Sequence, residues 1–242
     1  MSLSPVDFFD KDAQLESIHE LIVDCQFVWE ILPKIENFLS ALLQNKQVIN
    51  GTVSKDAYIS DKPLVIHETA VVEPGAFIQG PAYIGEGVLI RHGAYVRDNV
   101  IMLSNSLLGH ASEAKNSLFF PHAHAPHFNY IGDSILGSHV NLGAGTKLSN
   151  LTVVSEKDFK TGKRPTIKLT VNGQEYDTKL AKLGAILGNN AQTGCNSVLN
   201  PGCLVGKNTL VYANASLRKG YYPPNKMVKL RQQLEVTVRK KK

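Results

Sequence analysis

Three histidines lie close together near the middle of the chain: His122, His124 and His127. A neutral imidazole accepts a proton near pH 7, so a histidine in this segment can serve as a general base. Three imidazoles within six residues can also bind zinc, and His122 and His127 have a compatible spacing. The segment therefore offers two kinds of chemistry, proton transfer and metal binding.

Two cationic side chains, Arg97 and Lys115, are eighteen residues apart. An arginine supplies a planar fork of donors and a lysine supplies a point charge, so together they can hold a phosphate group. They can do so only where the fold brings them side by side. Arg91 is the reserve candidate for this role.

A repeat of six residues predicts the fold that must position these side chains. An apolar residue recurs at every sixth position: Ile66, Val72, Ile78, Ile84, Ile90, Val96, Met102, Leu108, Ala114 and Phe120. The fifth position of the early hexads is small, as in Ala70 and Ala76, and Gly and Asn gather between the hexads, as turns require. So short and strict a repeat predicts a mainly β solenoid, a parallel β-helix.

The six-residue frame shifts twice, and we interpret each shift as a loop pushed out of a coil. The first shift follows His122–Tyr130, and the frame resumes at Leu136. The second follows a long insert, 152–182, and the frame resumes at Leu187. Asn172-Gly173 within the insert predicts a β-hairpin turn.

The two ends of the chain differ from the repeats. Between Asp12 and Leu43 the apolar residues recur at steps of three and four, which predicts an amphipathic helical segment over 1–50, divided at Pro33. Its apolar stripe must be buried on the β-helix domain, 51–220, or on a partner. The basic tail, 221–242, is expected to hold a short helix from Lys226 to Glu235.

Composition narrows the class of protein. The net charge of +5 suits anionic small molecules, and no interleaving of aromatic and basic residues points to nucleic acid. No apolar run is long enough for a membrane span, and the start of the chain lacks the order of a secretory signal. Three cysteines without a CxxC pair argue against a disulfide framework, so we expect a cytoplasmic protein with no membrane partner.

The hexads, together with segments 127–133, 140–146 and 183–188, resemble the left-handed β-helix acyltransferases built from hexapeptide repeats. The resemblance is greatest to the C-terminal acetyltransferase domain of the bifunctional glucosamine-1-phosphate N-acetyltransferase/sugar-1-phosphate nucleotidyltransferases, over roughly residues 66–220. It implies a homotrimer that acetylates an amino-sugar phosphate in nucleotide-sugar biosynthesis, towards UDP-N-acetylglucosamine. Acetyl-CoA would be a co-substrate, with no tightly bound cofactor. Residues 1–65 do not match the nucleotidyltransferase domain.

The resemblance also implies a role for individual residues. His127 matches the catalytic base, Tyr130 and Asn141 match sugar contacts, and Arg97 and Lys115 match the pair that holds the sugar phosphate. The residues implied for CoA are Ala144 and Ala213 through their backbones, Asn150, Cys195 and, by position only, Lys229 with Arg231. Since the family has eighteen residues per coil, Arg97 and Lys115 should stack on one face. We expect the Cys195 side chain to be buried as small packing, and we expect no metal.

Two other functions are weighed against acetyl transfer. The β-helix superfamily includes γ-class carbonic anhydrases, whose metal histidines lie between subunits, but the residues around His122–His127 lack the glycines and acidic pattern of that class. The second is a non-catalytic β-helix module whose N-terminal helices dock a separate nucleotidyltransferase subunit.

Overall fold

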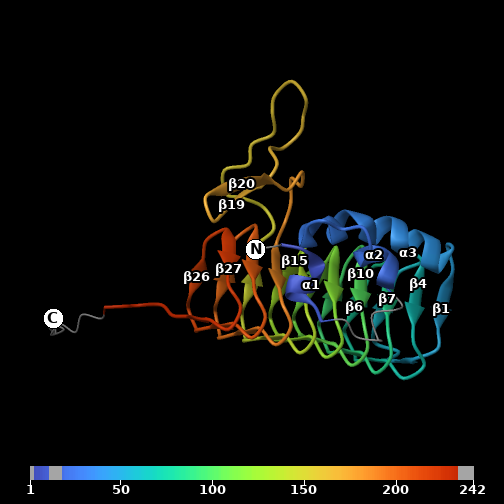
Figure 1. Ribbon diagram of the computed structural model, residues 1–242. Helices are drawn as coiled ribbons and strands as arrows, with labels where there is room; N and C mark the ends of the chain where they lie inside the picture. The colour runs from blue at the N-terminus through green and yellow to red at the C-terminus, as the bar shows by residue number, and fades with distance from the viewer. Residues whose placement is uncertain (1–2, 11–17, 234–242) are drawn as a thin grey trace, which may run out of the picture.

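The chain winds into a parallel β-helix of three flat faces, as the hexads predict (Figure 1). The computed structural model describes residues 3–10 and 18–233. Each coil contributes one strand to each face, and every strand pairs in parallel with the equivalent strand of the next coil. The predicted left-handed parallel β-helix is confirmed.

We name the three faces A, B and C. Face A consists of β1 (Gln47–Ile49), β4 (Leu64–Ile66), β7 (Ala82–Ile84), β10 (Val100–Met102), β13 (Ser117–Phe119), β16 (Ile135–Leu136), β21 (Ala185–Leu187), β24 (Cys203–Val205) and β27 (Gly220–Tyr222). Face B consists of β2 (Thr52–Val53), β5 (Val71–Val72), β8 (Leu89–Ile90), β11 (Leu107–His110), β14 (His124–His127), β17 (Asn141–Leu142), β22 (Gln192–Thr193), β25 (Leu210–Val211) and β28 (Met227–Val228). Face C consists of β3 (Tyr58–Ile59), β6 (Phe77–Ile78), β9 (Tyr95–Val96), β12 (Glu113–Lys115), β15 (Tyr130–Gly132), β18 (Lys147–Leu148), β23 (Val198–Leu199) and β26 (Ser216–Leu217).

The hexad residues fill the interior of the coils. Nearly every strand points one or two apolar side chains inward, and these side chains form a continuous buried core along the stack. Thr193 is the one polar residue in the later frame, and its hydroxyl lies 2.9 Å from the hydroxyl of Thr146 inside the coils. Because each hydroxyl has a partner, this polar pair is tolerated in the core.

The first frame shift has a different cause from the one predicted. Met102 pairs with Phe119, seventeen residues on, whereas Ile84 pairs with Met102, eighteen residues on. One residue is lost at the turn around Asn116 and a second at the turn around Asp133, and no loop is pushed out at His122–Tyr130. Phe119 therefore fills the core in place of the predicted Phe120, which points outward and stacks on Phe9 with ring centroids 4.3 Å apart.

The N-terminal helices cover face A, as Figure 1 shows. They are α1 (Pro5–Phe8), α2 (His19–Ile22), η2 (Val28–Lys34, a 3-10 helix that contains Pro33) and α3 (Ile35–Leu43). Their buried residues pack on outward-facing apolar residues of face A in a second core. The predicted apolar stripe is thus buried on the β-helix of the same chain, while the predicted helical start at Asp12 lies outside the described residues.

The insert forms the predicted hairpin. β19 (Lys168–Val171) and β20 (Gln174–Asp177) pair in antiparallel fashion around Asn172 and Gly173, both of which have positive φ, as a two-residue turn requires. The side chain of Tyr176 meets the rings of Phe27 and Trp29 edge-on, so the hairpin is attached to the helical layer.

The stack of strands is longer than the predicted domain 51–220. It begins at β1 and ends at β28, where the sequence predicted a helix. Residues 229–233 are not helical, and the rest of that predicted helix lies outside the described residues. Within the described part of the chain, no helix has the length and apolar character needed to cross a membrane.

Candidate active site

One corner of the β-helix, between faces B and C, carries four of the predicted site residues in a column. The carbonyl of His127 accepts a hydrogen bond from the amide of Gly145 at 3.0 Å, and the carbonyl of Ala144 accepts one from Asn196 at 2.8 Å. The carbonyl of Cys195 accepts one from Asn214 at 2.9 Å. His127, Ala144, Cys195 and Ala213 therefore occupy the same corner position in four successive coils.

The backbone amides of this column are available as donors. Among the described residues, the N–H groups of Ala144, Cys195 and Ala213 make no hydrogen bond, while the residues beside them are bonded from coil to coil. Successive coils are about 4.8 Å apart, so the three amides form a ladder of donors along the corner. Such donors can stabilise an oxyanion or hold the amide carbonyls of an extended ligand.

His127 ends β14, and its imidazole is exposed at the corner. Its backbone N–H donates to the side-chain oxygen of Asn129 at 3.0 Å. Asn129 is buried, and its side-chain amide donates in turn to the carbonyl of Gly143 at 2.8 Å. A buried asparagine thus fixes the backbone of His127 and leaves its imidazole free of hydrogen bonds within the described part of the chain.

Tyr130 lies on face C in a row with Glu113 and Lys147, one residue per coil. Its hydroxyl lies 3.4 Å from the side-chain oxygen of Asn150, a weak hydrogen bond. The Asn150 amide donates to Asp133, whose other oxygen accepts from Asn116 at 2.8 Å. Burial raises the pKa of Tyr130, and the nearby carboxylates of Glu113 and Asp133 raise it further.

Asp133 and Glu113 complete the site, and the sequence reasoning did not find them. Asp133 is only 6% exposed and holds Asn116 and Asn150 together. Asn116 and Asp133 occupy the two corners between faces C and A where seventeen-residue coils begin, and both have positive φ. The frame shift itself was the available signal, because a shortened corner draws polar side chains of adjacent coils together.

Arg97 and Lys115 stack on face C as expected, because Tyr95 and Val96 pair with Glu113 and Ala114. The Arg97 guanidinium donates to Glu113 at 2.8 Å, and the Lys115 ammonium lies 3.8 Å from Asp98. The hydrogen bond to Glu113 raises the pKa of Arg97.

The two cations keep some of their binding capacity. The Nε of Arg97 is the one buried side-chain nitrogen or oxygen without a hydrogen-bond partner among the described residues. The Lys115 contact with Asp98 is longer than a hydrogen bond. A phosphate between the two side chains would therefore gain donors, although it would compete with Glu113 for Arg97.

Asn141 lies apart from the other predicted sugar contacts. It is exposed on face B, in a row with His124 and Gln192, whereas Tyr130 projects from face C. A strand's outward side chains leave its own face, so Asn141 and Tyr130 of one chain point in different directions. One copy of the chain does not bring them to the same ligand.

The remaining predicted CoA residues lie along or beside the corner. Cys195 is exposed, so the expectation that it is buried packing is wrong; Cys203 is the buried thiol. The corner position places Cys195 at the turn between β22 and β23, where side chains face water. The Lys229 ammonium lies 5.1 Å from the ring of Tyr212, next to Ala213. Arg231 is exposed beyond the last strand.

The histidines do not form a metal centre in one chain. His122 lies in the turn before β14 and His127 ends that four-residue strand, so the two positions lie at opposite ends of the strand. In the described part of the chain, no three histidine, cysteine or acidic side chains are grouped closely enough to hold a metal ion.

Comparison with known proteins identifies relatives of the chain. No protein-family model matches it. It is 31% identical over 186 residues to the bifunctional protein GlmU of Methanococcus maripaludis strain S2, a match that covers 77% of this chain and 42% of the relative. It is 32% identical to a bifunctional sugar-1-phosphate nucleotidylyltransferase/acetyltransferase of Sulfurisphaera tokodaii, over 70% of this chain and 40% of that one. The chain thus spans less than half the length of these relatives.

A solved structure shows a weaker likeness. The UDP-N-acetylglucosamine acyltransferase of Francisella novicida aligns with 75% of this chain and 67% of its own, at 15% identity and a TM-score of 0.40. A likeness at that level carries no argument about function. The sequence relatives show that the chain is homologous to part of these bifunctional proteins, and the three-faced stack built from hexads gives it the fold of a hexapeptide-repeat, left-handed β-helix.

Proposed function

We propose that the chain transfers the acetyl group of acetyl-CoA to the amine of an amino-sugar phosphate such as glucosamine 1-phosphate. The observation that carries the proposal is the corner between faces B and C. The free imidazole of His127 and a ladder of free backbone amides line this edge of face C, and face C itself carries the phenol of Tyr130 and the stacked cations Arg97 and Lys115. The name of the Sulfurisphaera tokodaii relative, which includes a sugar-1-phosphate substrate and an acetyltransferase activity, agrees with that chemistry.

The proposed reaction is a direct transfer. The amine nitrogen attacks the thioester carbonyl, and His127 takes a proton from that nitrogen as the carbon–nitrogen bond forms. The amide of Ala144 stabilises the oxyanion of the tetrahedral intermediate. When the carbon–sulfur bond breaks, the leaving thiolate receives the proton from the imidazolium. The products are an N-acetyl amino-sugar phosphate and free CoA thiol.

Each of the two substrates is assigned to its own part of the site. Arg97 and Lys115 hold the sugar phosphate, and Tyr130 contacts the sugar ring. The pantetheine arm of CoA runs along the corner, with its amides against Cys195 and Ala213 and its polar groups near Asn150 and Lys229.

The proposed site is shared between copies of the chain. Since Asn141 and Tyr130 leave different faces, a sugar contacted by both must lie between face B of one copy and face C of another. A rotational assembly supplies such a junction three times in a homotrimer. Its product is of the class that a nucleotidyltransferase consumes, which makes a separate nucleotidyltransferase subunit a natural partner.

The test is thiol release from acetyl-CoA in the presence of glucosamine 1-phosphate. Loss of a general base costs about 10²- to 10⁴-fold in rate, so we expect His127→Asn to fall in that range. His92→Ala is the matched control, because His92 is an exposed histidine two coils away along the same corner. The absence of thiol release from the wild-type chain, or an active His127→Asn, would overturn the proposal. Binding of a nucleotidyltransferase without CoA binding would favour the non-catalytic module.

A further inference from the structure

Phe128 follows the proposed base His127 in the chain, and its side chain lies at the corner between faces B and C. β14 ends at His127, so Phe128 is the first residue of the turn that leads to face C. It is 53% exposed, a large fraction for a phenylalanine. An apolar ring can neither transfer a proton nor hold a phosphate. The reaction proposed above therefore gives this exposed ring no role.

The conformation of Phe128 is unusual for so large a residue. Its φ of 38° lies in the left-handed region, where a bulky side chain is an outlier. In four other coils the residue at this corner position is small or polar and also has positive φ. Those residues are Ala111, Gly145, Asn196 and Asn214. A strained residue in place of a small one is typical of a functional site, so the ring of Phe128 calls for a function.

The turn that carries Phe128 is held on both sides. The backbone N–H of His127 donates to the side-chain oxygen of Asn129 at 3.0 Å. The backbone N–H of Asn129 donates to the hydroxyl of Ser112, also at 3.0 Å. Asn129 and Ser112 are both buried, so these hydrogen bonds are costly to break. The position of the Phe128 backbone, and of the ring that it carries, is therefore fixed.

The ring of Phe128 extends one coil along the stack and covers Gly145. A Cβ atom at position 145 would lie 3.2 Å from Cε2 and 3.5 Å from Cδ2 of this ring. Any side chain there would press on the ring, so glycine leaves the space that the ring needs. Gly145 directly follows Ala144, whose backbone N–H belongs to the ladder of free donors. The ring thus lies beside the amide that is proposed to hold the oxyanion.

We infer that Phe128 is the specificity-determining residue that limits the transferred acyl group to acetyl. The inference rests on the proposed function, which places the thioester on the amide of Ala144. The carbonyl carbon of a thioester carries an oxygen, a sulfur and the acyl chain. In the proposed reaction the oxygen faces Ala144 and the sulfur leads along the ladder towards Cys195. The acyl chain is the remaining substituent, and the ring of Phe128 is the apolar surface beside it.

The size of the ring sets the selectivity. The methyl group of an acetyl thioester packs on the ring, whereas each further methylene of a longer chain needs space that the ring fills. Because the turn is fixed, the ring cannot move away to admit such a chain. One methylene more or less in an apolar site changes kcat/KM by about 10- to 200-fold. The bonds made and broken are those of the proposed transfer, whatever the length of the chain.

The test compares acetyl-, propionyl- and butyryl-CoA as donors, with glucosamine 1-phosphate as acceptor and thiol release as the readout. The wild-type chain should prefer acetyl- to propionyl-CoA by about tenfold or more in kcat/KM. Phe128→Ala should lower this preference at least about tenfold, because it removes the ring that excludes the added methylene. Ala111 shows that alanine adopts the same corner conformation. Phe128→Leu, which keeps part of the bulk, should lie between the two.

Leu42→Ala is the matched control, because Leu42 is 46% exposed on α3 in the helical layer, away from the corner. It should keep the wild-type preference. Sedimentation velocity and circular dichroism of every variant show whether it assembles and folds like the wild-type chain. An assembled Phe128→Ala with the wild-type preference would overturn the inference and leave the proposed function standing.

Three other results also count against the inference. A Phe128→Ala variant that slows all three donors equally and no longer assembles would show that the ring packs on a neighbouring copy instead. A wild-type chain that uses the three donors equally well would show that the acyl group is not selected. A wild-type chain that releases thiol from none of them would overturn the proposed function, and the inference would fail with it.

Discussion

All three faces point apolar residues into the core of the coils. They differ in what covers their outward residues. The outward residues of face A, such as Ile101 and Leu118, are fully buried beneath the N-terminal helices. The outward residues of faces B and C are uncovered, and on the first coils they are nonetheless apolar. On face C, Tyr58 stacks on Phe77 at 4.5 Å, and Phe77 meets Tyr95 edge-on at 5.2 Å. The difference indicates that face A is completed within the chain, and uncovered faces B and C are what the proposed trimer would require.

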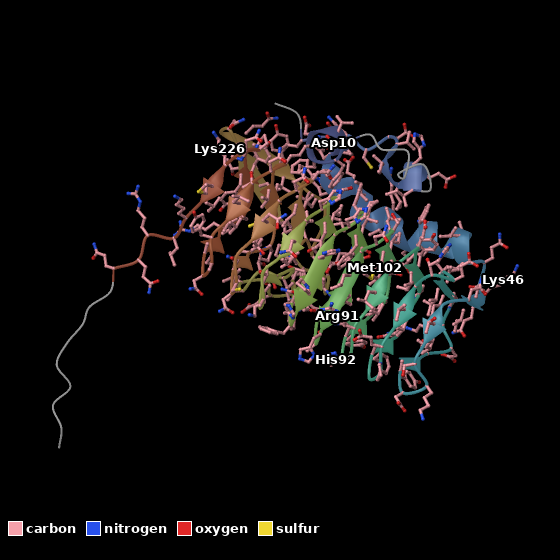
Figure 2. The ribbon with its side chains drawn as sticks, turned by 90° about the horizontal axis from the view of Figure 1, so that it is seen from below. Asp10, Lys46, Arg91, His92, Met102 and Lys226 are labelled. Carbon is pink, nitrogen blue, oxygen red and sulfur yellow. The ribbon has the colours of Figure 1, made fainter. Side chains whose placement is uncertain are left out.

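Faces B and C also change character along the stack. In the early coils face B presents Val71, Leu89 and Leu107 in one row. The same row continues with His124 and Asn141, at the height of the polar row around Tyr130 on face C. The apolar coils suit contact between copies, and the polar coils above them suit a site between copies. Figure 2 shows the uncovered coils from below, with Arg91 and His92 on the side away from the helical layer.

The largest expected effect is a loss of folding stability when a residue that covers face A is removed. Trp29 is 2% exposed and packs between the helices and the hairpin, so Trp29→Ala should lower the free energy of unfolding by about 3–5 kcal/mol. Phe77→Ala on face C removes a side chain that is 37% exposed and should lower the stability of an isolated copy far less. Chemical denaturation of both variants below the assembly concentration measures the contrast. Equal losses would show that face C is not an open surface.

A smaller effect is expected at Asp133. Asp133→Asn keeps the shape but cannot accept from both Asn116 and Asn150, so Asn150 and with it Tyr130 lose their orientation. We expect kcat/KM for the amino-sugar phosphate to fall about tenfold, roughly the 1.4 kcal/mol of one charged hydrogen bond. Asn116→Ala, which removes only the outer partner, is the control and should cost less. If kcat and KM of Asp133→Asn equal those of the wild-type chain, Asp133 does not position the site.

Much of this fold could be predicted from the sequence because a solenoid repeats one local rule. Each inward residue from Ile66 to Ala114 follows from the six-residue spacing, and so does the hairpin turn at Asn172-Gly173. The prediction failed by one residue at Phe120, because hexad counting cannot see that the corner at Asn116 is one residue shorter. Residue spacing predicts which residues point inward only while every corner has the same number of residues.

The site was harder to predict than the fold. The stacking of Arg97 and Lys115 followed from the spacing of one coil. That Asn141 and Tyr130 leave different faces depends on where each corner falls, which requires the coils themselves. The exposure of Cys195 was missed for the same reason, since a small residue at a hexad corner looks like a small residue in the core.

The corner between faces A and B, where covered and uncovered surfaces meet, should respond to pH. Asn190, Asn208 and Asn225 form a hydrogen-bonded ladder there, but in earlier coils His122 and His139 take the equivalent place, with their rings stacked 4.7 Å apart. Burial lowers the pKa of His122, and His139 and His124 lower it further.

The sign of the pH effect follows from this shift. Because the folded-state pKa of His122 lies below its ordinary value of about 6.5, the unfolded chain binds more protons as the pH falls through that value. The contribution of His122 to the stability of the fold is fully present above about pH 6.5. It is lost progressively as the pH falls below that value and through the lowered pKa of His122. His139→Asn, which extends the asparagine ladder and removes one neighbouring charge, should flatten the fall in melting temperature between about pH 7 and 5. A melting curve as steep as that of the wild-type chain would contradict this assignment.

The smallest expected effect concerns the thiol of Cys195. Its backbone amide belongs to the donor ladder, but its exposed side chain has no partner among the described residues. Cys195→Ala should therefore change kcat/KM for acetyl-CoA by less than about twofold, as a surface substitution does. Alkylation of the wild-type thiol adds bulk at the corner, so it should slow transfer in the wild-type chain and leave Cys195→Ala unaffected, and acetyl-CoA should protect against it. If alkylation is harmless, the corner at Cys195 is not the path of CoA, and the uncovered faces must hold the thioester elsewhere.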